Sequence, residues 1–344
     1  MTYRESIRKV LTLPGLPIEK LSGENILITG ATGLIGSALV DALMANNNID
    51  YHVYASGRNQ HRARFLFSDY FDSPFFHYIS YDVMTPLDSD IEFHYIVHAA
   101  SNASPAFFVS SPVEIVKANI LGLCNLLDYG KNHGLKRLLY VSSGEIYGEG
   151  EGMIIDESYR GSIDHMSPRS SYPVSKIAAE NLCVAYSKEY DIDTVIARPC
   201  HVYGPQFTES DNRVFAQFLR NILNDQDIVL KSAGEQFRSW CYVVDCASAL
   251  FYILLKGERG EAYNIVSKDS NVSIKEFAEI IAEIGNKKVV RQESSYSESA
   301  GYNRVVKSLF SAVQLNTLGW ISLYCIKDGL LETLNSLSYK ESSN

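Results

Sequence analysis

The 344-residue chain has no uninterrupted apolar run near the ~20 residues that a membrane-spanning helix needs. The best candidate, residues 246–255, is about half that length, and we expect it to form a buried helix. The N-terminal residues lack the continuous apolar stretch of a secretory signal. We therefore expect a cytoplasmic protein with no membrane partner.

Cysteine and histidine are present without the spacings that metal sites or disulfide frameworks use. The six cysteines form no C-x-x-C pair, and a chain of this length does not need a disulfide framework to fold. The eight histidines show neither H-x-x-x-H nor H-E-x-x-H spacing. We predict reduced thiols and no metal site.

Excess positive charge is also absent. Acidic residues outnumber basic ones by 40 to 31, for a net charge of −9, which argues against general nucleic-acid binding because phosphate backbones attract positive charge. Hydrophobic residues make up 46% of the chain, enough to bury a large core. At about 150 residues per domain, the length leaves room for two domains.

Short apolar strands alternate with helical stretches through the first half of the chain. Because each strand is apolar on both faces, the pattern predicts a parallel, doubly wound sheet of the Rossmann type. The expected strands are 25–29, 51–55, 77–81, 95–99 and 138–142, and the expected helices are 34–44, 112–133 and 172–190.

Three regions follow from this pattern. Residues 1–24 are expected to form a helical extension packed on the outside of the sheet. Residues 25–198 would form the dinucleotide-binding domain with the catalytic groups. Residues 199–344, with long loops and brief strands at 227–230 and 262–266, would form mainly a smaller mixed α/β lobe for the substrate.

A glycine-rich turn directly follows the first expected strand. Gly30, Gly33 and Gly36 allow a tight turn, close approach of backbone to a pyrophosphate, and close packing of helix on strand. The helix start then offers free N–H groups to phosphates. Such spacing alone often marks only a strand-to-helix turn, but at the first strand of a β/α pattern it predicts a dinucleotide site. The same turn brings Thr32, Leu34 and Ile35 to the cofactor.

The end of the second strand bears on which dinucleotide binds. NAD sites usually place an acidic residue here, and this chain has none. Ser56 and Arg58 would suit the 2′-phosphate of NADP, although Arg58 could equally be a solvated loop residue. We therefore predict NAD(P), with a slight preference for NADP. Asp82 and Val83, after the third strand, could receive the adenine, while Asp82 could instead cap the next turn.

Tyr172 and Lys176 are four residues apart at the start of an expected helix, so their side chains share one face. A nearby ammonium would favour the phenolate form of the tyrosine. Tyr172 could then exchange a proton with a sugar hydroxyl while hydride moves to or from nicotinamide. Ser143, at the end of the fifth strand, is placed to bond the same oxygen. Elsewhere Y-x-x-x-K is usually an ordinary exposed helical pair; the glycine turn makes the catalytic interpretation preferable.

These motifs resemble the extended short-chain dehydrogenase/reductase family, in its NAD-dependent epimerase/dehydratase group that modifies nucleotide sugars. The resemblance covers about residues 25–266. It is carried by GATGLIG (30–36), VHAASNASP (97–105), KANILG (117–122), VSSGEIYG (141–148), YPVSK (172–176), ARPCHVYGP (197–205) and FRSWCYVVD (237–245).

The resemblance implies further roles at matching positions. Lys176 would bond the nicotinamide ribose as well as complete a catalytic triad with Tyr172 and Ser143. Asn119 would support the active-site strand from its helix, and the backbone of Val202 would hold the carboxamide. The residues after the fourth strand would line the cofactor, namely Ala99, Ala100 and Ser101, with Ser101 also near the substrate. Arg238 and Arg213 would clamp the diphosphate, although Arg213 could equally form a surface ion pair.

Local stretches, including NASPA and SPRSSY, most resemble the UDP-glucuronate decarboxylase branch. Glu145 matches a glutamate that takes part in that reaction and could act as a second acid or base; bonding loop amides is the other role open to it. Two positions depart from that branch: Gly144 replaces a serine, and His201 replaces an asparagine. His201 could face the substrate or could instead bond backbone groups. Because Gly144 carries no carboxyl group, a 4,6-dehydratase is disfavoured.

Every branch shares hydride transfer at C4 of a hexose linked to UDP, dTDP or CDP. The sequence therefore predicts a 4-keto sugar reductase or 4-epimerase, with a UDP-glucuronate decarboxylase as the alternative and a non-catalytic cofactor-binding scaffold or sensor as a further one. A role in polysaccharide biosynthesis would fit a nucleotide-sugar enzyme of this family. The resemblance also implies a homodimer through a four-helix bundle of residues 112–133 and 172–190.

Overall fold

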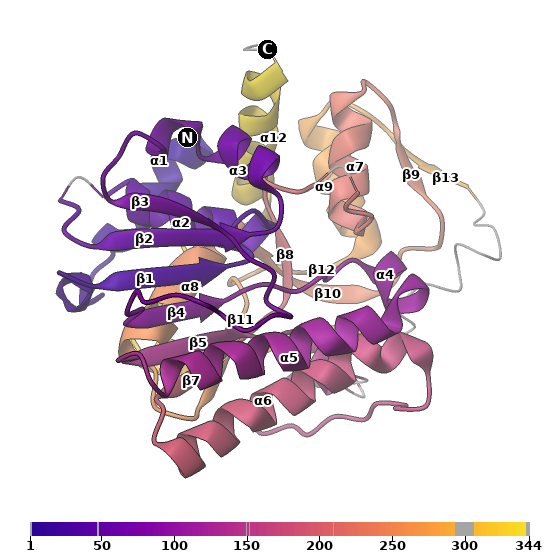
Figure 1. Ribbon diagram of the computed structural model, residues 1–344. Coiled ribbons are helices and arrows are strands. Elements are labelled where there is room, and N and C mark those ends of the chain that lie inside the picture. The colour runs from indigo at the N-terminus through magenta and orange to yellow at the C-terminus, as the bar shows by residue number, and fades with distance from the viewer. Residues whose placement is uncertain are drawn as a thin grey trace.

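The computed structural model describes residues 2–46, 48–148, 150, 152–208, 210–292 and 306–341 (Figure 1). Its main feature is a sheet of seven parallel strands in the order β11-β7-β5-β4-β1-β2-β3. The strands are β1 (Asn25–Thr29), β2 (His52–Gly57), β3 (Phe76–Ser80), β4 (Tyr95–His98), β5 (Arg137–Val141), β7 (Thr194–Pro199) and β11 (Ala262–Ile265).

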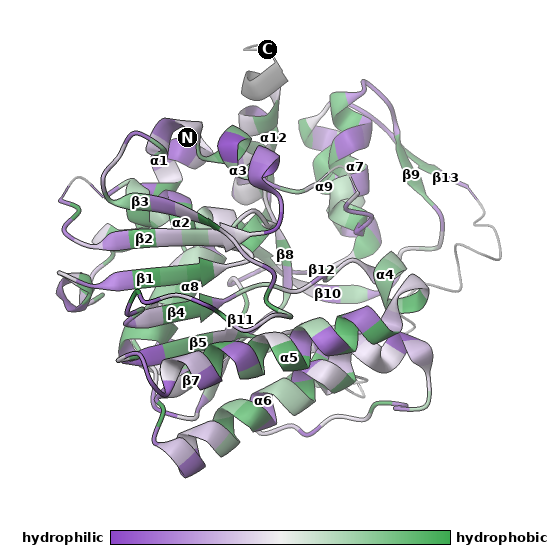
Figure 2. Ribbon diagram, in the orientation of Figure 1, coloured by the Kyte–Doolittle hydropathy of each residue, from purple (hydrophilic) through white to green (hydrophobic). Residues whose placement is uncertain are grey.

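Helices cover both faces of this sheet. Ile26 and Ile28 of β1 pack in one apolar cluster with α2 (Leu34–Met44) and α8 (Val243–Lys256), whereas Leu27 points into a second cluster beneath α5 (Pro112–Gly130) and α6 (Ser171–Tyr190). Alternate residues of one strand thus enter opposite layers, as a doubly wound sheet requires. Figure 2 shows hydrophobic residues concentrated in the inner strands and α8, and a mixed surface on α5 and α6. The predicted Rossmann fold is confirmed.

The N-terminal segment departs from the single helix expected over residues 1–24. It forms three short helical pieces, α1 (Tyr3–Ile7), η1 (Val10–Thr12) and η2 (Ile18–Leu21). Pro14 and Pro17 interrupt any longer helix because proline lacks a backbone N–H. The segment packs on α2, α8 and the C-terminal helix α12 (Ile326–Glu341), and its last piece also reaches the sheet, where the Tyr95 hydroxyl donates to the carbonyl of Lys20.

Beyond residue 199 the chain builds a smaller lobe and also returns to the main sheet. Strand β11 pairs with β7, and α8 packs beneath the sheet, so the Rossmann layer extends past the boundary predicted at residue 198. The strand expected at 262–266 therefore belongs to the main sheet and not to the lobe. Periodicity could not show this, because a strand's partner is chosen by tertiary packing.

The lobe contains two small sheets. One has the order β12-β10-β14-β6 with β8 paired to β10, and the other pairs β13 with β9. Its strands are β6 (Ile154–Ile155), β8 (His201–Tyr203), β9 (Ile228–Leu230), β10 (Phe237–Tyr242), β12 (Asn271–Ser273), β13 (Val289–Arg291) and β14 (Lys307–Phe310), and its helices are α7 (Val214–Leu223) and α9 (Ile274–Ile284). Helix α11 (Val313–Thr317) follows β14 and contacts β11 of the main sheet.

Short elements connect these layers. They are α3 (Gln60–Leu66), η3 (Ser68–Tyr70), α4 (Pro105–Ser110), η4 (Gly144–Tyr147) and η5 (Pro168–Ser170). Among the described residues, no helix combines the length and apolar character needed to cross a membrane. Within the same residues, no group of three or more histidine, cysteine, aspartate or glutamate side chains is placed to hold a metal ion.

Candidate active site

A cleft of about 1700 Å³ runs along the carboxyl ends of the main strands, under the smaller lobe. Ligands of doubly wound proteins bind at this edge, where the connecting loops diverge. All but one of the predicted site residues line it: Gly30, Thr32, Gly33, Leu34, Ile35, Gly36, Ser56, Arg58, Asp82, Val83, Ala99, Ala100, Ser101, Ser143, Glu145, Tyr172, Lys176, His201, Val202, Arg213 and Arg238. The exception is Asn119.

The glycine turn has the geometry that a bound pyrophosphate needs. Gly30 has a φ of +68°, and a Cβ there would lie 2.7 Å from backbone atoms of Ala99 and Ala100. At Gly36 a Cβ would lie 2.3 Å from the carbonyl oxygen of Gly30, so glycine lets α2 pack directly on the turn. Gly33 precedes α2 and places no side chain over the free N–H groups of its first turn. The turn fits a dinucleotide.

The end of β2 holds one buried and one exposed polar group. The Ser56 hydroxyl is buried and has no hydrogen-bond partner among the described residues. The Arg58 guanidinium is largely exposed and lies 3.8 Å from the Asp82 carboxylate. Asp82 also accepts a hydrogen bond from the backbone N–H of Met84 at 3.1 Å, so it does cap the turn after β3.

Sequence reasoning missed Arg62, which joins the two sides of the cleft. Its Nε donates to the carbonyl of Thr32 in the glycine turn at 2.9 Å, and its Nη2 donates to the carbonyl of Gln206 at 2.9 Å. The side chain therefore ties the glycine turn to the loop after β8. The only signal in the sequence was a second arginine four residues after Arg58. Its contact with Gln206 could not be predicted, because the two residues are 144 positions apart.

Tyr172 lies in the first turn of α6 and is 5% exposed. Its ring stacks on Phe108 of α4, with centroids 4.5 Å apart and planes at 11°. Burial raises the pKa of the phenol to about 12, with Glu145 adding to the rise, while a hydrogen bond with Ser143 and the charge of Arg213 oppose it. The phenol is thus held beside the Ser143 hydroxyl.

Lys176 is fully enclosed on the next turn of α6. Its Nζ donates to the carbonyl of Val141 at 2.7 Å and lies 5.7 Å from the centroid of the Tyr172 ring. Burial lowers the pKa of this ammonium to about 7, against the attraction of Glu180. The expected acidification of Tyr172 by this ammonium is not among the causes that shift the pKa of the phenol, of which burial is the largest.

Asn119 of α5 connects the cofactor side of the cleft to the catalytic helix. Its Oδ1 accepts from the Ser101 hydroxyl and its Nδ2 donates to the Ser175 hydroxyl, both at 2.8 Å. Ser175 directly precedes Lys176. The asparagine therefore supports α6 and the loop after β4, and it stays outside the cleft.

Charged groups gather in the cleft beyond Tyr172. Glu145 lies 3.5 Å from Arg169, whose Nε is buried without a partner among the described residues. Burial lowers the pKa of Arg238 to about 10, so it remains charged at neutral pH, and Glu145 attracts it. Arg213 is held by the carboxylate of Asp211, with the shortest contact at 2.6 Å.

His201 completes this end of the cleft. Burial, with the nearby charge of Arg238 as the next cause, lowers its pKa to about 3, so the ring is neutral at physiological pH. Its Nδ1 is buried and has no partner among the described residues. A hydrogen bond with the backbone of Ser239 opposes this fall in pKa, so the ring lines the cleft and also bonds a backbone group.

Comparisons with known proteins identify the family of this chain. The sequence of residues 26–266 matches the pattern of the NAD dependent epimerase/dehydratase family. UDP-glucuronic acid decarboxylase 6 of Arabidopsis thaliana is 34% identical over 266 residues, which cover 76% of this chain and 75% of that protein.

Two solved structures share the fold. UDP-glucuronic acid 4-epimerase of Bacillus cereus, in complex with UDP-glucuronic acid and NAD, has a TM-score of 0.78 at 23% identity, covering 92% of this chain and 99% of that one. A dTDP-glucose 4,6-dehydratase of Streptomyces venezuelae with NAD bound has a TM-score of 0.79 at 21% identity, covering 93% and 98%.

The fold and the cleft define an enzyme of the extended short-chain dehydrogenase/reductase class. More particularly, the chain belongs to the NAD-dependent epimerase/dehydratase family. The family resemblance read from the sequence is thereby confirmed.

Proposed function

We propose that this protein transfers hydride at C4 of a hexose carried on a nucleoside diphosphate, as a 4-epimerase or a 4-keto sugar reductase. The observation that carries the proposal is the convergence of Ser143, Tyr172 and Lys176 in one cleft. The glycine turn and Arg238 line the same cleft. Residues of the glycine turn and of the lobe both line this cleft of about 1700 Å³, so a dinucleotide and a nucleotide sugar can meet different residues.

The chain's own groups handle the proton at C4. When bound, the nicotinamide accepts or donates the hydride. Tyr172 exchanges the proton of the C4 oxygen, and Ser143 bonds the same oxygen. A phenol with a pKa of about 12 keeps its proton at neutral pH, which suits protonation of a keto oxygen. For the reverse step the phenol needs a positive charge nearby, since such a charge lowers its pKa.

Binding of the sugar nucleotide falls to the lobe. Arg238 and Arg213 would meet the diphosphate, because guanidinium groups pair with phosphate oxygens in a bidentate manner. The UDP-sugar relatives support this assignment of substrate class. Arg213 would have to share its guanidinium with Asp211, so Arg238 is the stronger of the two candidates.

For the cofactor we propose NAD(P), with a slight preference for NADP. The unpartnered Ser56 hydroxyl and the exposed Arg58 support a 2′-phosphate, while the proteins of similar fold that carry NAD support the plain dinucleotide. The absence of an acidic side chain at the end of β2 removes the usual ribose partner of NAD.

A second candidate, decarboxylation of UDP-glucuronate, is favoured by the pairing of Glu145 with Arg169. Oxidation at C4 would place a ketone β to the C5 carboxylate and ease its loss, and Arg169 could hold that carboxylate. The relatives at 34% identity add weight to this candidate. A non-catalytic scaffold is disfavoured, because all three groups that the chemistry needs face the cleft.

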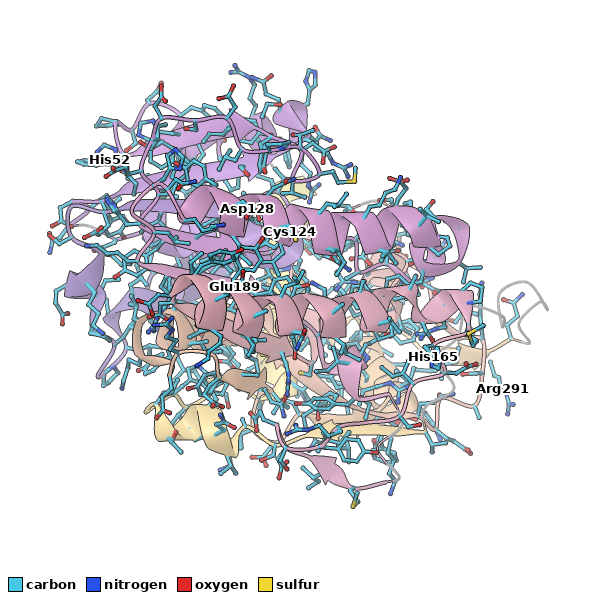
Figure 3. The ribbon with its side chains drawn as sticks, turned by 60° about the horizontal axis from the view of Figure 1, so that its bottom comes forward. His52, Cys124, Asp128, His165, Glu189 and Arg291 are labelled. Carbon is cyan, nitrogen blue, oxygen red and sulfur yellow. The ribbon has the colours of Figure 1, made fainter. Side chains whose placement is uncertain are left out.

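We also propose a homodimer through α5 and α6. These helices run side by side across the face shown in Figure 3, where Cys124, Asp128 and Glu189 mark them. Their outer surface exposes large apolar side chains, including Val113 at 61%, Leu121 at 46% and Ile177 at 41%. Two such pairs would pack as a four-helix bundle and remove this apolar surface from water.

The test is turnover on defined nucleotide sugars. Purified protein would be incubated with UDP-glucose, UDP-glucuronate or a dTDP-4-keto-6-deoxyhexose, with each form of NAD(P). Mass spectrometry and NMR would then identify the product. Epimerisation or keto reduction supports the proposal, release of CO₂ from UDP-glucuronate supports the second candidate, and no conversion of any sugar contradicts both.

A further inference from the structure

Gly144 stands between Ser143 and Glu145, and its backbone does not explain why it is glycine. Its φ lies outside the positive range that favours glycine. A Cβ at this position would instead lie 2.7 Å from Cζ and 2.8 Å from Cε2 of Phe310. The phenyl ring therefore occupies the space that a side chain at position 144 would fill.

Phe310 is held firmly in that place. It ends β14, where it pairs with Ile155 of β6, and its backbone N–H donates to the Ser239 hydroxyl at 2.9 Å. Its ring lies 5.6 Å from the ring of Tyr147. It is 5% exposed, and its exposed edge lines the cleft. A ring fixed on several sides forms a wall of the site and has little room to move away.

The wall is chemically unlike its neighbours. Ser143, Glu145, Arg238 and His201 all offer polar groups to the cleft. Phe310 offers an aromatic surface, which packs against carbon-bound hydrogens and supplies no conventional hydrogen-bond donor or acceptor. A hydroxyl or carboxylate pressed against this ring would lose its hydrogen bonds to water without replacement.

We propose that Phe310 determines sugar specificity by selecting a substrate that is apolar where it meets position 144. This inference rests on the proposed function, in which Ser143 bonds the C4 oxygen. Because the ring lies beside position 144, next to Ser143, the sugar group that meets it would sit on a carbon adjacent to C4, and C3 and C5 are the two carbons that the tests compare. The substrate class is a nucleotide-linked sugar that lacks a polar substituent there: a 6-deoxyhexose, a pentose or a 3-deoxy sugar.

The first test compares sugars that differ only next to C4. UDP-glucose would be set against UDP-xylose, a 6-deoxyglucose nucleotide and a 3-deoxyglucose nucleotide, with kcat and KM measured for each. We expect at least one sugar without the polar group to exceed UDP-glucose in kcat/KM by about 10- to 100-fold, the range that one group in an apolar pocket supplies.

Variants at Phe310 show whether the ring causes this preference. In Phe310→Asn, which offers a donor and an acceptor, the preference should fall by about tenfold or reverse. Phe310→Leu is the matched control, since it stays apolar and should keep the preference. Equal ratios in wild type and Phe310→Asn would overturn the inference, provided that both proteins melt at similar temperatures.

A second pair of variants tests the contact itself. Gly144→Ala alone should weaken sugar binding and lower the melting temperature, because the new methyl meets the ring. Adding Phe310→Ala should recover part of both losses, a non-additive result expected only of residues in contact. If the losses of the two single changes simply add, Phe310 does not fill the space beside position 144 and the inference is contradicted.

Failure of the proposed function can be told apart from failure of this inference. If wild type converts none of the sugars, the proposed function fails, and dissociation constants for the same sugars then decide about Phe310. A binding preference that Phe310→Asn abolishes would still support the inference. Equal binding of all sugars by both proteins would overturn it.

Discussion

The ammonium of Lys176 and the carbonyl of Val141 are joined by a buried hydrogen bond of 2.7 Å. Val141 is the last residue of β5, two positions before Ser143, and Lys176 lies one helical turn after Tyr172. This bond therefore ties the catalytic helix to the strand that carries the serine. It fixes the separation of Tyr172 and Ser143, the two groups that we propose bond the C4 oxygen.

Lys176 also makes the stability of the free protein depend on pH. Its pKa falls from about 10.4 in an unfolded chain to about 7 in the folded protein. Between these values the unfolded chain binds the proton more strongly, so the free energy of unfolding rises with pH. In Lys176→Met this contribution should vanish. Urea unfolding of both proteins from about pH 7 to about pH 9 measures the difference; parallel slopes would contradict it.

Tyr172→Phe removes only the hydroxyl and keeps the stack on Phe108. Turnover should fall by about 10²- to 10⁴-fold, the usual contribution of a positioned acid or base. Cofactor binding, measured by fluorescence titration, should persist. Tyr190→Phe, at the far end of the same helix, is the control and should leave the rate unchanged. Undiminished turnover in Tyr172→Phe would remove the catalytic assignment.

Asn119→Ala should act through position and not through substrate contact. The change leaves the Ser101 hydroxyl without this partner, while the Ser175 hydroxyl keeps its bond to the carbonyl of Tyr172, and it should cost about 1–3 kcal/mol of folding stability. Because the helix bearing Lys176 loses support, kcat should fall while KM for the sugar changes little. Thermal melts and steady-state kinetics measure both. A rise in KM with kcat unchanged would place Asn119 in substrate binding instead.

Arg58→Ala tests the preference for the phosphorylated cofactor. If Arg58 meets a 2′-phosphate, the dissociation constant for NADPH should rise about tenfold or more, while that for NADH stays nearly constant. Arg64→Ala, on the following helix, keeps the net charge change equal and should affect neither cofactor. Equal effects of Arg58→Ala on both cofactors would favour the solvated-loop interpretation of this residue.

Ile177→Glu tests the proposed dimer. The carboxylate would be buried against the partner's apolar surface without a cation, so association should weaken strongly. Sedimentation velocity should show a dimer for wild type and a monomer for the variant. Leu331→Glu, an equally exposed apolar position on α12, is the control and should remain dimeric. A monomeric wild type at micromolar concentration would contradict the dimer itself.

Much of this enzyme could be read from local sequence. Gly30, Gly33 and Gly36 predicted the turn because each answers a steric demand within a few residues of chain. The apolar strands predicted a sheet covered on both faces, and the spacing of Tyr172 and Lys176 predicted a shared helix face. Each of these features depends on residues close together in the sequence, so it can be predicted without knowing the fold.

Tertiary structure alone decided the rest. No local pattern shows that β11 closes the main sheet, that Arg62 reaches the carbonyl of Gln206, or that burial overrides charge attraction at Tyr172. The meeting of Gly144 with Phe310 joins positions far apart in the chain. The backbone conformation that a residue requires is set by its own type and its near neighbours in sequence. Burial and side-chain partners depend instead on which distant segments the folded core brings together.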